Sequence, residues 1–314
     1  MNNYEKTLAI SVRGVSHIAS GKPVQDYSLA IAGDGFSIAV VCDGHGADKH
    51  FRSEIGSKFA AEVSRDMLIQ FLALNNDWNT FNKDTNKKLD RLKLSVLASW
   101  HERIEKYTAE NPFTADELKK ASASFATRKQ YDVSQPYGTT ILAALVARDY
   151  YLVMMIGDGA IAKINGDFTA SIVSFEGKQV FDDQPHSATD SLCSQNAYET
   201  IFFSHGQLAE NDTVAFALCS DGMSEAFITD ELLLGKFKNY LNYYAEEGLE
   251  KANEAITAQL NQLSQLSAMK DDISLAFATN NLSVFDKRKA IADEPTNDDN
   301  RTKKNRKKPM EKST

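Results

Sequence analysis

"VVCDGHGADKHF", residues 40–51, is the stretch that decides the fold. Its first residues end an apolar run, 36–42, whose composition predicts a β-strand. The run stops at Asp43, and Gly44, His45 and Gly46 follow before a polar segment that predicts the start of a helix. A turn would need only the glycines, so the added carboxylate and imidazole indicate a site at the end of this strand.

Similar short apolar runs rich in Val and Ile recur along the chain. They predict further strands at 8–12, 27–33, 139–147, 150–156, 213–219 and 273–279. Short turn-like links, "AGDG" at 32–35 and "ARDY" at 147–150, join neighbouring runs. We therefore expect hairpins and largely antiparallel sheets.

Apolar stripes with helical spacing lie between the strand-like runs. They predict helices near 51–71, 89–104, 115–128, 231–245 and 247–266. This order lacks the strict alternation of a doubly wound fold. The sequence predicts an α+β fold, a four-layer αββα sandwich of two mainly antiparallel sheets flanked by helices. Residues 176–212 have few periodic apolar positions and predict a mobile flap, with a short strand at 200–203.

Composition and charge indicate the cellular compartment and limit the classes of partner that we expect. The 314 residues carry a net charge of −8, and residues 301–314 alone carry +6. The acidic remainder disfavours a nucleic-acid binder, except through the basic tail. The scattered cysteines and the lack of a membrane-length apolar run indicate a cytoplasmic protein. We expect one domain at 1–282 and a charged, disordered tail at 283–314 that solubilises, folds back or docks an anionic partner.

Carboxylates stand at the ends of five predicted strands. They are Asp26, Asp43, Asp158, Asp221 and the pair Asp271 and Asp272. Neighbouring antiparallel strands bring such ends to one edge of a sheet, where several carboxylates repel one another unless a cation neutralises them. Oxygen ligands alone favour Mg²⁺ or Mn²⁺ over zinc. A single Asp-Gly is an ordinary turn signal, so the joint pattern carries the prediction.

Six segments, in order, resemble the metal-dependent protein phosphatase (PPM) family, the type 2C serine/threonine phosphatases, in a bacterial-like form. These segments are "PVQD" at 23–26, "VCDGHGA" at 41–47, "YGTTILAALV" at 137–146, "IGDGAIAKI" at 156–164, "CSDGMSEAF" at 219–227 and "DDISLAFA" at 271–278. The resemblance implies a serine/threonine protein phosphatase with two Mg²⁺ or Mn²⁺ ions, and a looser third, at one edge of the sandwich.

The resemblance also implies roles for the acids. Asp43 would bridge the two ions and the Gly44 carbonyl would add a ligand, while Asp221 and Asp271 would complete the second site. Asp26 would hold a metal or its water. Asp158 would join Asp221 at the third ion, and Asp272 is a weaker candidate ligand.

The implied reaction is hydrolysis of phosphoserine or phosphothreonine by a metal-activated bridging water. His45 would donate a proton to the leaving alkoxide as general acid. The family often has a phosphate-binding Arg before the Gln-Asp element, but no Arg lies between Gly14 and Asp26. Either His17 or Lys22 would then bind the substrate phosphate, or the affinity for phosphate would be low.

Two alternatives stay open: a pseudophosphatase or phosphoprotein-binding module, and a phosphatase of a small phosphorylated molecule. The expected partners are a phosphorylated protein substrate and a cognate kinase, and the expected state is a monomer.

Overall fold

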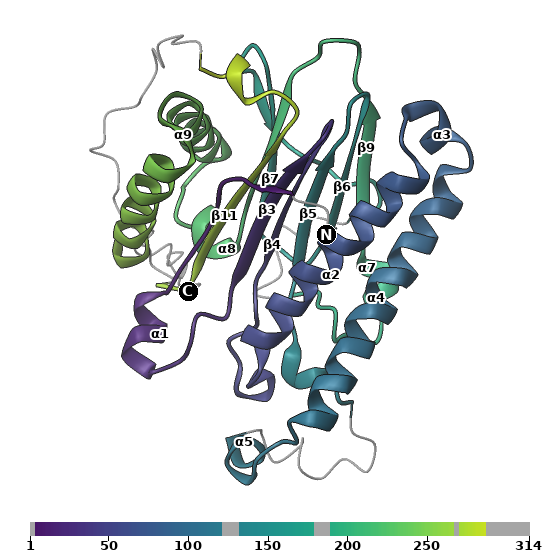
Figure 1. Cartoon of the computed structure of the whole chain (residues 1–314). Coiled ribbons are helices and arrows are strands. Elements are labelled where there is room, and N and C mark those ends of the chain that lie inside the picture. Colours follow the sequence, from purple (N-terminus) through teal and green to yellow (C-terminus); the bar gives the residue numbers. More distant parts are fainter. Residues whose placement is uncertain (1–3, 121–131, 179–188, 267–269, 287–314) are drawn as a thin grey trace, which may run out of the picture.

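A computed structural model describes residues 4–120, 132–178, 189–266 and 270–286 of the protein. Two β-sheets lie face to face, with helix α9 (Asp230–Leu266) on one outer side and helices α2 (Ser53–Leu74) and α4 (Thr85–Glu110) on the other (Figure 1). This arrangement confirms the predicted four-layer α+β sandwich. In the described part of the chain, no helix is both long enough and apolar enough to span a membrane.

Both sheets are antiparallel at every described pairing. The first has the order β1 (Glu5–Lys6), β3 (Tyr27–Gly33), β4 (Phe36–Cys42), β5 (Ile141–Val146), β6 (Tyr150–Ile156) and β9 (Phe202–Gln207). The second has the order β2 (Ala9–Val12), β11 (Ile273–Thr279), β10 (Val214–Cys219), β7 (Ala160–Asn165) and β8 (Ala170–Ile172).

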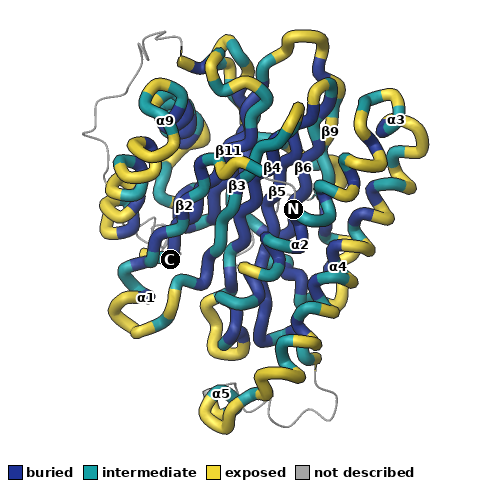
Figure 2. The backbone as a smooth tube through the Cα atoms, in the orientation of Figure 1, coloured by how far each residue is buried: buried dark blue, intermediate teal, exposed yellow. Residues whose placement is uncertain are grey.

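The central strands are buried on both faces, which explains their nearly continuous apolar sequences (Figure 2). In β4, Ile38 and Val40 pack toward the α2 and α4 layer, whereas Ala39 and Val41 pack toward the second sheet. Successive side chains of a strand point to opposite faces, so one short strand contributes to two cores. A third core lies between the second sheet and α9, where Phe237 is fully buried.

Short helices complete the chain between the strands and the long helices. They are α1 (Val15–Ser20), α3 (Trp78–Asn82), α5 (Ala115–Lys120), α7 (Ala197–Thr200) and α8 (Asp221–Ser224), with 3-10 turns at Asp48–His50, Gln135–Tyr137 and Leu282–Val284. In α9, Gly248 has non-helical torsions, which matches the two helices predicted there. Of the helix predicted at 115–128, only its first turns are described, because 121–131 lie outside the described residues.

The structure departs from the sequence-based expectations in several segments. Strands β1, β7 and β8 were not expected. Much of the predicted flap at 176–212 is packed: β9 pairs with β6, and Leu192 is fully buried. Residues 179–188 of that segment lie outside the described residues.

The packed core also extends past residue 282. Phe285 is fully buried, and its ring lies 5.5 Å from that of Phe168. Residues 287–314, most of the expected tail, lie outside the described residues.

Candidate metal centre

Strand register brings the predicted acids to one edge of the sandwich. Tyr27 pairs with Cys42. Because Asp26 precedes Tyr27 and Asp43 follows Cys42 on the antiparallel neighbour, both acids lie at the same edge of the sheet. In the second sheet, Cys219 pairs with both Ala160 and Leu275. The residues that follow Cys219 therefore run beside the segments that carry Asp158, Asp271 and Asp272.

The backbone of Asp43 is fixed by the two threonines that precede β5. Its N–H donates to Thr140 Oγ1 at 3.0 Å, and its carbonyl accepts from the Thr140 N–H at 2.9 Å and from Thr139 Oγ1 at 2.8 Å. The next residue must be glycine, because a Cβ on Gly44 would lie 2.4 Å from the Gln25 carbonyl oxygen. These contacts fix the backbone of Asp43 at the strand end.

The carboxyl groups perturb one another strongly. Burial, followed by the charges of Asp26 and Asp221, raises the pKa of Asp43 well above its usual range. Burial and the charge of Asp272 raise the pKa of Asp26 to about 8, and burial raises the pKa of Asp221 to about 6. The charge of Asp158 acts on both Asp43 and Asp221. These acids therefore form one electrostatic cluster.

This cluster has the donor atoms that a hard divalent cation requires. Asp26 Oδ2 and Asp221 Oδ1 are buried and have no hydrogen-bond partner. Unpaired buried carboxylate oxygens are costly, and mutual repulsion adds to that cost. Oxygen-only donors suit Mg²⁺ or Mn²⁺, and a bound cation would offset both the cost of the unpaired oxygens and the repulsion between the carboxylates. The residues present thus fit the metals that the sequence resemblance implies.

Asp271 and Asp272 have different surroundings despite being adjacent. The Asp271 side chain is 42% exposed, and its charge acts on Asp221. Asp272 is 1% exposed, and its oxygens accept the backbone N–H groups of Gly14 and Gln25, both at 2.6 Å. Asp272 therefore ties two loops to the start of β11, which leaves it less free to bind a cation than Asp271.

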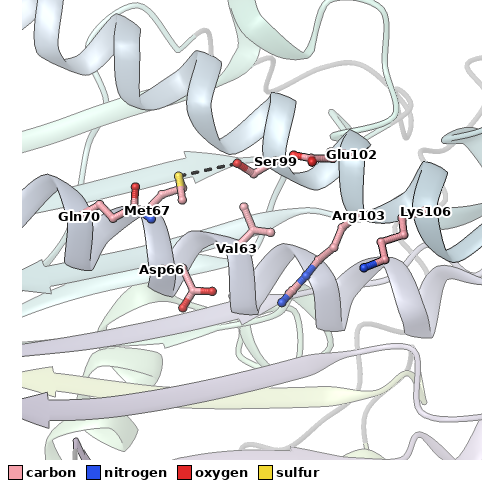
Figure 3. Close-up of a pocket in the computed structure, with 8 residues that line it drawn as sticks. All are labelled: Val63, Asp66, Met67, Gln70, Ser99, Glu102, Arg103 and Lys106. Carbon is pink, nitrogen blue, oxygen red and sulfur yellow. Dashed lines mark hydrogen bonds between the residues drawn. The ribbon is translucent and has the colours of Figure 1, made fainter. Parts of the chain in front are cut away.

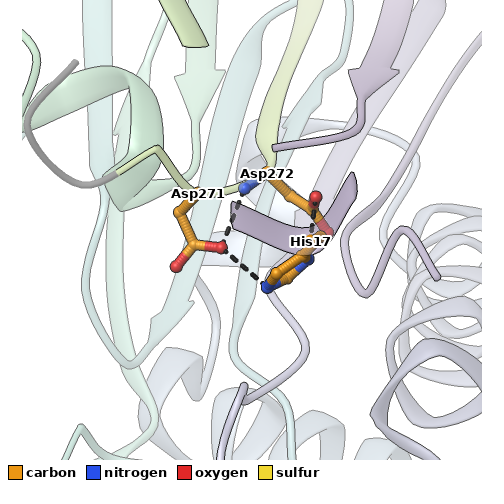
Figure 4. A group of neighbouring side chains, drawn as sticks. All are labelled: His17, Asp271 and Asp272. Atoms are coloured by element: carbon orange, nitrogen blue, oxygen red, sulfur yellow. Dashed lines mark hydrogen bonds and ion pairs between the residues drawn. The ribbon is translucent and has the colours of Figure 1, made fainter. Parts of the chain in front are cut away.

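His17 lies between these two carboxylates (Figure 4). Its Nε2 is 3.2 Å from Asp271 Oδ1, and its Nδ1 is 3.0 Å from Asp272 Oδ1. Both contacts are ion pairs between the imidazole and a carboxylate. The carboxylate of Asp272 raises the pKa of His17 most. The ring thus faces carboxylates, not an open phosphate position.

His45 follows Asp43 by two residues, in the loop that leaves strand β4. Its N–H donates to the Gly138 carbonyl at 3.1 Å, and its carbonyl accepts from Gln25 Nε2 at 3.2 Å. Its ring is 4.9 Å from the ring of His50, between centroids. Burial and the charge of Lys49 lower the pKa of His45 to about 4. The imidazole is therefore neutral at pH 7 in the absence of a bound anion.

Two lysines reach the edge that carries the acids. Lys22 Nζ donates to the Gly46 carbonyl at 2.5 Å, one residue from His45. Lys178 Nζ donates to the Gly157 carbonyl at 2.8 Å, next to Asp158. Lys178 escaped the sequence analysis because it lies in a segment without periodicity, and its only signal was a basic side chain within the predicted flap.

Polar residues that support the acids were also missed. Thr189 Oγ1 donates to Asp158 Oδ2 at 2.7 Å. Gln25 is buried and links His45 to α2, since its Nε2 also donates to Ser53 Oγ at 2.5 Å. Their short polar side chains are ordinary in loops, so the sequence alone gave no reason to select them.

The two described grooves lie away from the acids. One, of about 270 Å³, lies between α2 and α4 and mixes Asp66, Glu102 and Arg103 with Met67 (Figure 3). The other, of about 530 Å³, lies beside the β3–β4 turn and Arg148, at the opposite strand ends. Neither contains a predicted site residue.

Comparisons with known proteins agree with this architecture. A bacterial serine phosphatase structure is 16% identical over 89% of this chain and 98% of its own, with a TM-score of 0.53. Serine/threonine phosphatase Stp1 from Staphylococcus aureus is 16% identical over 89% and 96%, at 0.50. A C. elegans sex determining protein is 12% identical over 91% and 67%, at 0.54. At these identities the likeness shows the fold. No curated protein sequence matches.

The sequence itself matches a family model over most of its length. That model describes protein phosphatase 2C and matches residues 13–261, a range that includes every predicted site residue except Asp271 and Asp272. The match confirms the resemblance drawn from the motifs, and the chain belongs to the protein phosphatase 2C family of metal-dependent phosphatases.

Proposed function

We propose that the protein hydrolyses phosphoserine and phosphothreonine in protein substrates with the help of Mn²⁺ or Mg²⁺. The observation that carries the proposal is the cluster of buried carboxylates with orphaned oxygens at one edge of the sandwich. Such a cluster is unfavourable without a cation, so its presence supports a working metal site over an abandoned one.

The acids divide between neighbouring cation positions. Asp43 would contact two cations, with the Gly44 carbonyl and Asp26 at the first and with Asp221 and Asp271 at the second. The hydrogen bonds that join the Asp43 segment to residues 138–140, just before β5, use the Asp43 carbonyl and the His45 N–H, so the Gly44 carbonyl takes no part in them. Asp158 and Asp221 would hold a looser third ion. When bound, two cations lower the pKa of water and stabilise charge on a phosphoryl group at neutral pH.

His45 would protonate the leaving serine or threonine oxygen. Its neutral ring needs a nearby anion to take up a proton, and a substrate phosphate dianion supplies that charge. Backbone bonds at its N–H and carbonyl fix where the ring can lie. Lys22 is the better placed of the two predicted phosphate-binding residues, because its Nζ donates to the Gly46 carbonyl, one residue from His45.

The substrate class is the part of the proposal that needs a direct test. A panel of phosphoserine and phosphothreonine peptides, set beside small phosphorylated metabolites, should be assayed with Mn²⁺. Fast release of phosphate from peptides supports a protein phosphatase. Faster release from metabolites favours the small-molecule alternative, and binding of phosphopeptides without turnover favours the pseudophosphatase.

The biological setting follows from the same proposal. A phosphoprotein phosphatase opposes a protein kinase, so a cognate kinase that modifies the same substrates is the expected partner. The cysteines Cys42, Cys193 and Cys219 are all free, which suits a reducing cytoplasm. We expect a monomer, which size-exclusion chromatography with light scattering would test.

A further inference from the structure

The first turn of helix α1 is built onto the start of strand β11. The Gly14 N–H donates to Asp272 Oδ1 at 2.6 Å, and the Ser16 N–H donates to the Lys270 carbonyl at 2.9 Å. A Cβ on Gly14 would lie 2.3 Å from the backbone carbon of Asp271, so the two segments touch at backbone level. Any side chain on this turn therefore has a fixed position relative to Asp271.

His17 is the α1 side chain that uses this position. It is 6% exposed, and its two ring nitrogens contact Asp271 Oδ1 and Asp272 Oδ1 (Figure 4). The guanidinium of Arg13 also donates to the His17 carbonyl at 3.0 Å, which restrains the backbone of α1 at this residue. The ring is thus held both by its own helix and by the carboxylates that it contacts.

The two oxygens of Asp271 differ in their contacts. Oδ1 lies 3.2 Å from His17 Nε2 and accepts the Asp272 N–H at 2.8 Å. Among the described residues, no donor contacts Oδ2, which points away from His17 (Figure 4). One oxygen is therefore occupied and oriented, while the other is available to a cation.

We propose that His17 is a positioning residue, whose Nε2–H holds Oδ1 of Asp271 so that Oδ2 is presented to the second cation. This inference rests on the proposed function, because it assumes that Asp271 binds a metal. Outer partners that orient a ligating carboxylate commonly change metal affinity by about 10-fold to 100-fold when removed. The inference replaces a phosphate-binding role for His17, since a phosphate beside this ring would also face two carboxylates.

The test compares two substitutions whose amide groups replace different ring nitrogens of His17. His17→Gln can place an amide N–H about where Nε2 lies, whereas His17→Asn reaches only as far as Nδ1. Ser20→Ala is the matched control, because Ser20 lies on the same helix and its hydroxyl, among the residues described, bonds only to backbone carbonyls of α1. Mn²⁺ binding to the metal-free full-length proteins is counted by the EPR signal of free manganese, and the KM for a phosphoserine peptide is measured at saturating Mn²⁺.

We expect His17→Asn to weaken one of the bound Mn²⁺ ions by about 10-fold or more, with the KM for the peptide little changed. His17→Gln and Ser20→Ala should stay close to the unchanged protein. Unaltered Mn²⁺ binding in His17→Asn would overturn the inference. A raised KM with unaltered Mn²⁺ binding would also overturn it, and would assign His17 to the phosphate.

A measurement on the unchanged protein covers the case in which His17→Asn fails to fold. Nitrogen-15 NMR of the Mg²⁺-loaded protein should show a proton on His17 Nε2, and a bare Nε2 would exclude the proposed bond. If the unchanged protein bound neither Mn²⁺ nor Mg²⁺, the proposed function would fail, and the inference would fail with it.

Discussion

Asp26→Asn should stabilise the metal-free protein although it damages the metal site. Asp26 is 5% exposed, and its pKa rises from 3.8 to about 8, first because of burial and then because of the charge of Asp272. An acid whose pKa is higher in the folded protein favours folding less as the pH rises. The unfolded chain ionises above pH 3.8, whereas the folded protein resists ionisation until about pH 8, so stability falls through this window.

The magnitude follows from the width of that window. Each pH unit between the unfolded pKa and pH 7 costs about 1.4 kcal/mol, so the penalty at pH 7 is about 4 kcal/mol for this group. Asp43 and Asp221 share the repulsion and keep part of the penalty after Asp26 is replaced. We therefore expect a gain of about 2 kcal/mol, or about 4–8 °C in Tm for a domain of this size.

Urea unfolding of the full-length protein in chelator, at pH 5 and pH 7.5, measures this effect. The gain from Asp26→Asn should be larger at pH 7.5, and Mn²⁺ should stabilise the variant less than the unchanged protein. Asp34→Asn is the control, because the Asp34 side chain is 95% exposed and, within the described part of the chain, pairs with Arg148 alone, at 3.0 Å. A metal-free Asp26→Asn that is no more stable at pH 7.5 would refute the reasoning.

Three further predictions address the general acid, the helix layer and the domain end. His45→Gln should slow hydrolysis of phosphoserine peptides far more than that of an activated aryl phosphate, whose leaving group needs no proton; equal losses would remove the acid role. Glu117→Gln should lower the free energy of unfolding by about 1.5–3 kcal/mol, because Arg52 pairs with both Glu117 oxygens, at 2.7 and 3.0 Å. The pKa of Glu117 is about 2 in place of 4.5, chiefly because of its hydrogen bonds with Arg52, so this stabilisation is complete above pH 4.5 and is lost as the pH falls toward 2. Urea unfolding should show the variant's full deficit at pH 6 and less than half of it at pH 3, and an equal deficit at both would contradict this assignment. Ending the chain after Asp286 should preserve the Tm, whereas a further cut that removes the buried Phe285 should cost about 3–5 kcal/mol, and an unchanged Tm would show that Phe285 adds nothing to the core.

Much of the fold could be predicted because its longer strands are nearly continuous apolar runs, and β4, β6 and β11 are almost entirely buried. Strands β3, β4, β6 and β11 have the bounds expected from their apolar runs. Strand β9 (Phe202–Gln207) was harder because it is an edge strand, and its polar Ser204 and His205 interrupt the apolar pattern. Strand β8 has three residues, which is too short for any periodicity.

The acids could be predicted as a group because each stands at a strand end, and antiparallel pairing brings these strand ends to one edge of the sandwich. The environment of His17 could not, because it depends on a contact between residues about 250 positions apart in the chain. The sequence offered His17 as a cation near the missing Arg, and only the packing of α1 on β11 shows that carboxylates surround it. The same limit applies to Lys178, whose neighbour Gly157 lies on another strand end.

The most direct test of a metal-dependent mechanism is phosphate release from a phosphoserine peptide by the metal-free protein as Mn²⁺ is added. We expect no turnover in chelator, turnover that rises with bound Mn²⁺, and a loss of several orders of magnitude in Asp43→Asn, with the Asp34→Asn control unaffected. Full turnover in excess chelator, or an Asp43→Asn variant as active as the unchanged protein, would contradict a mechanism that depends on cations held by this cluster of acids.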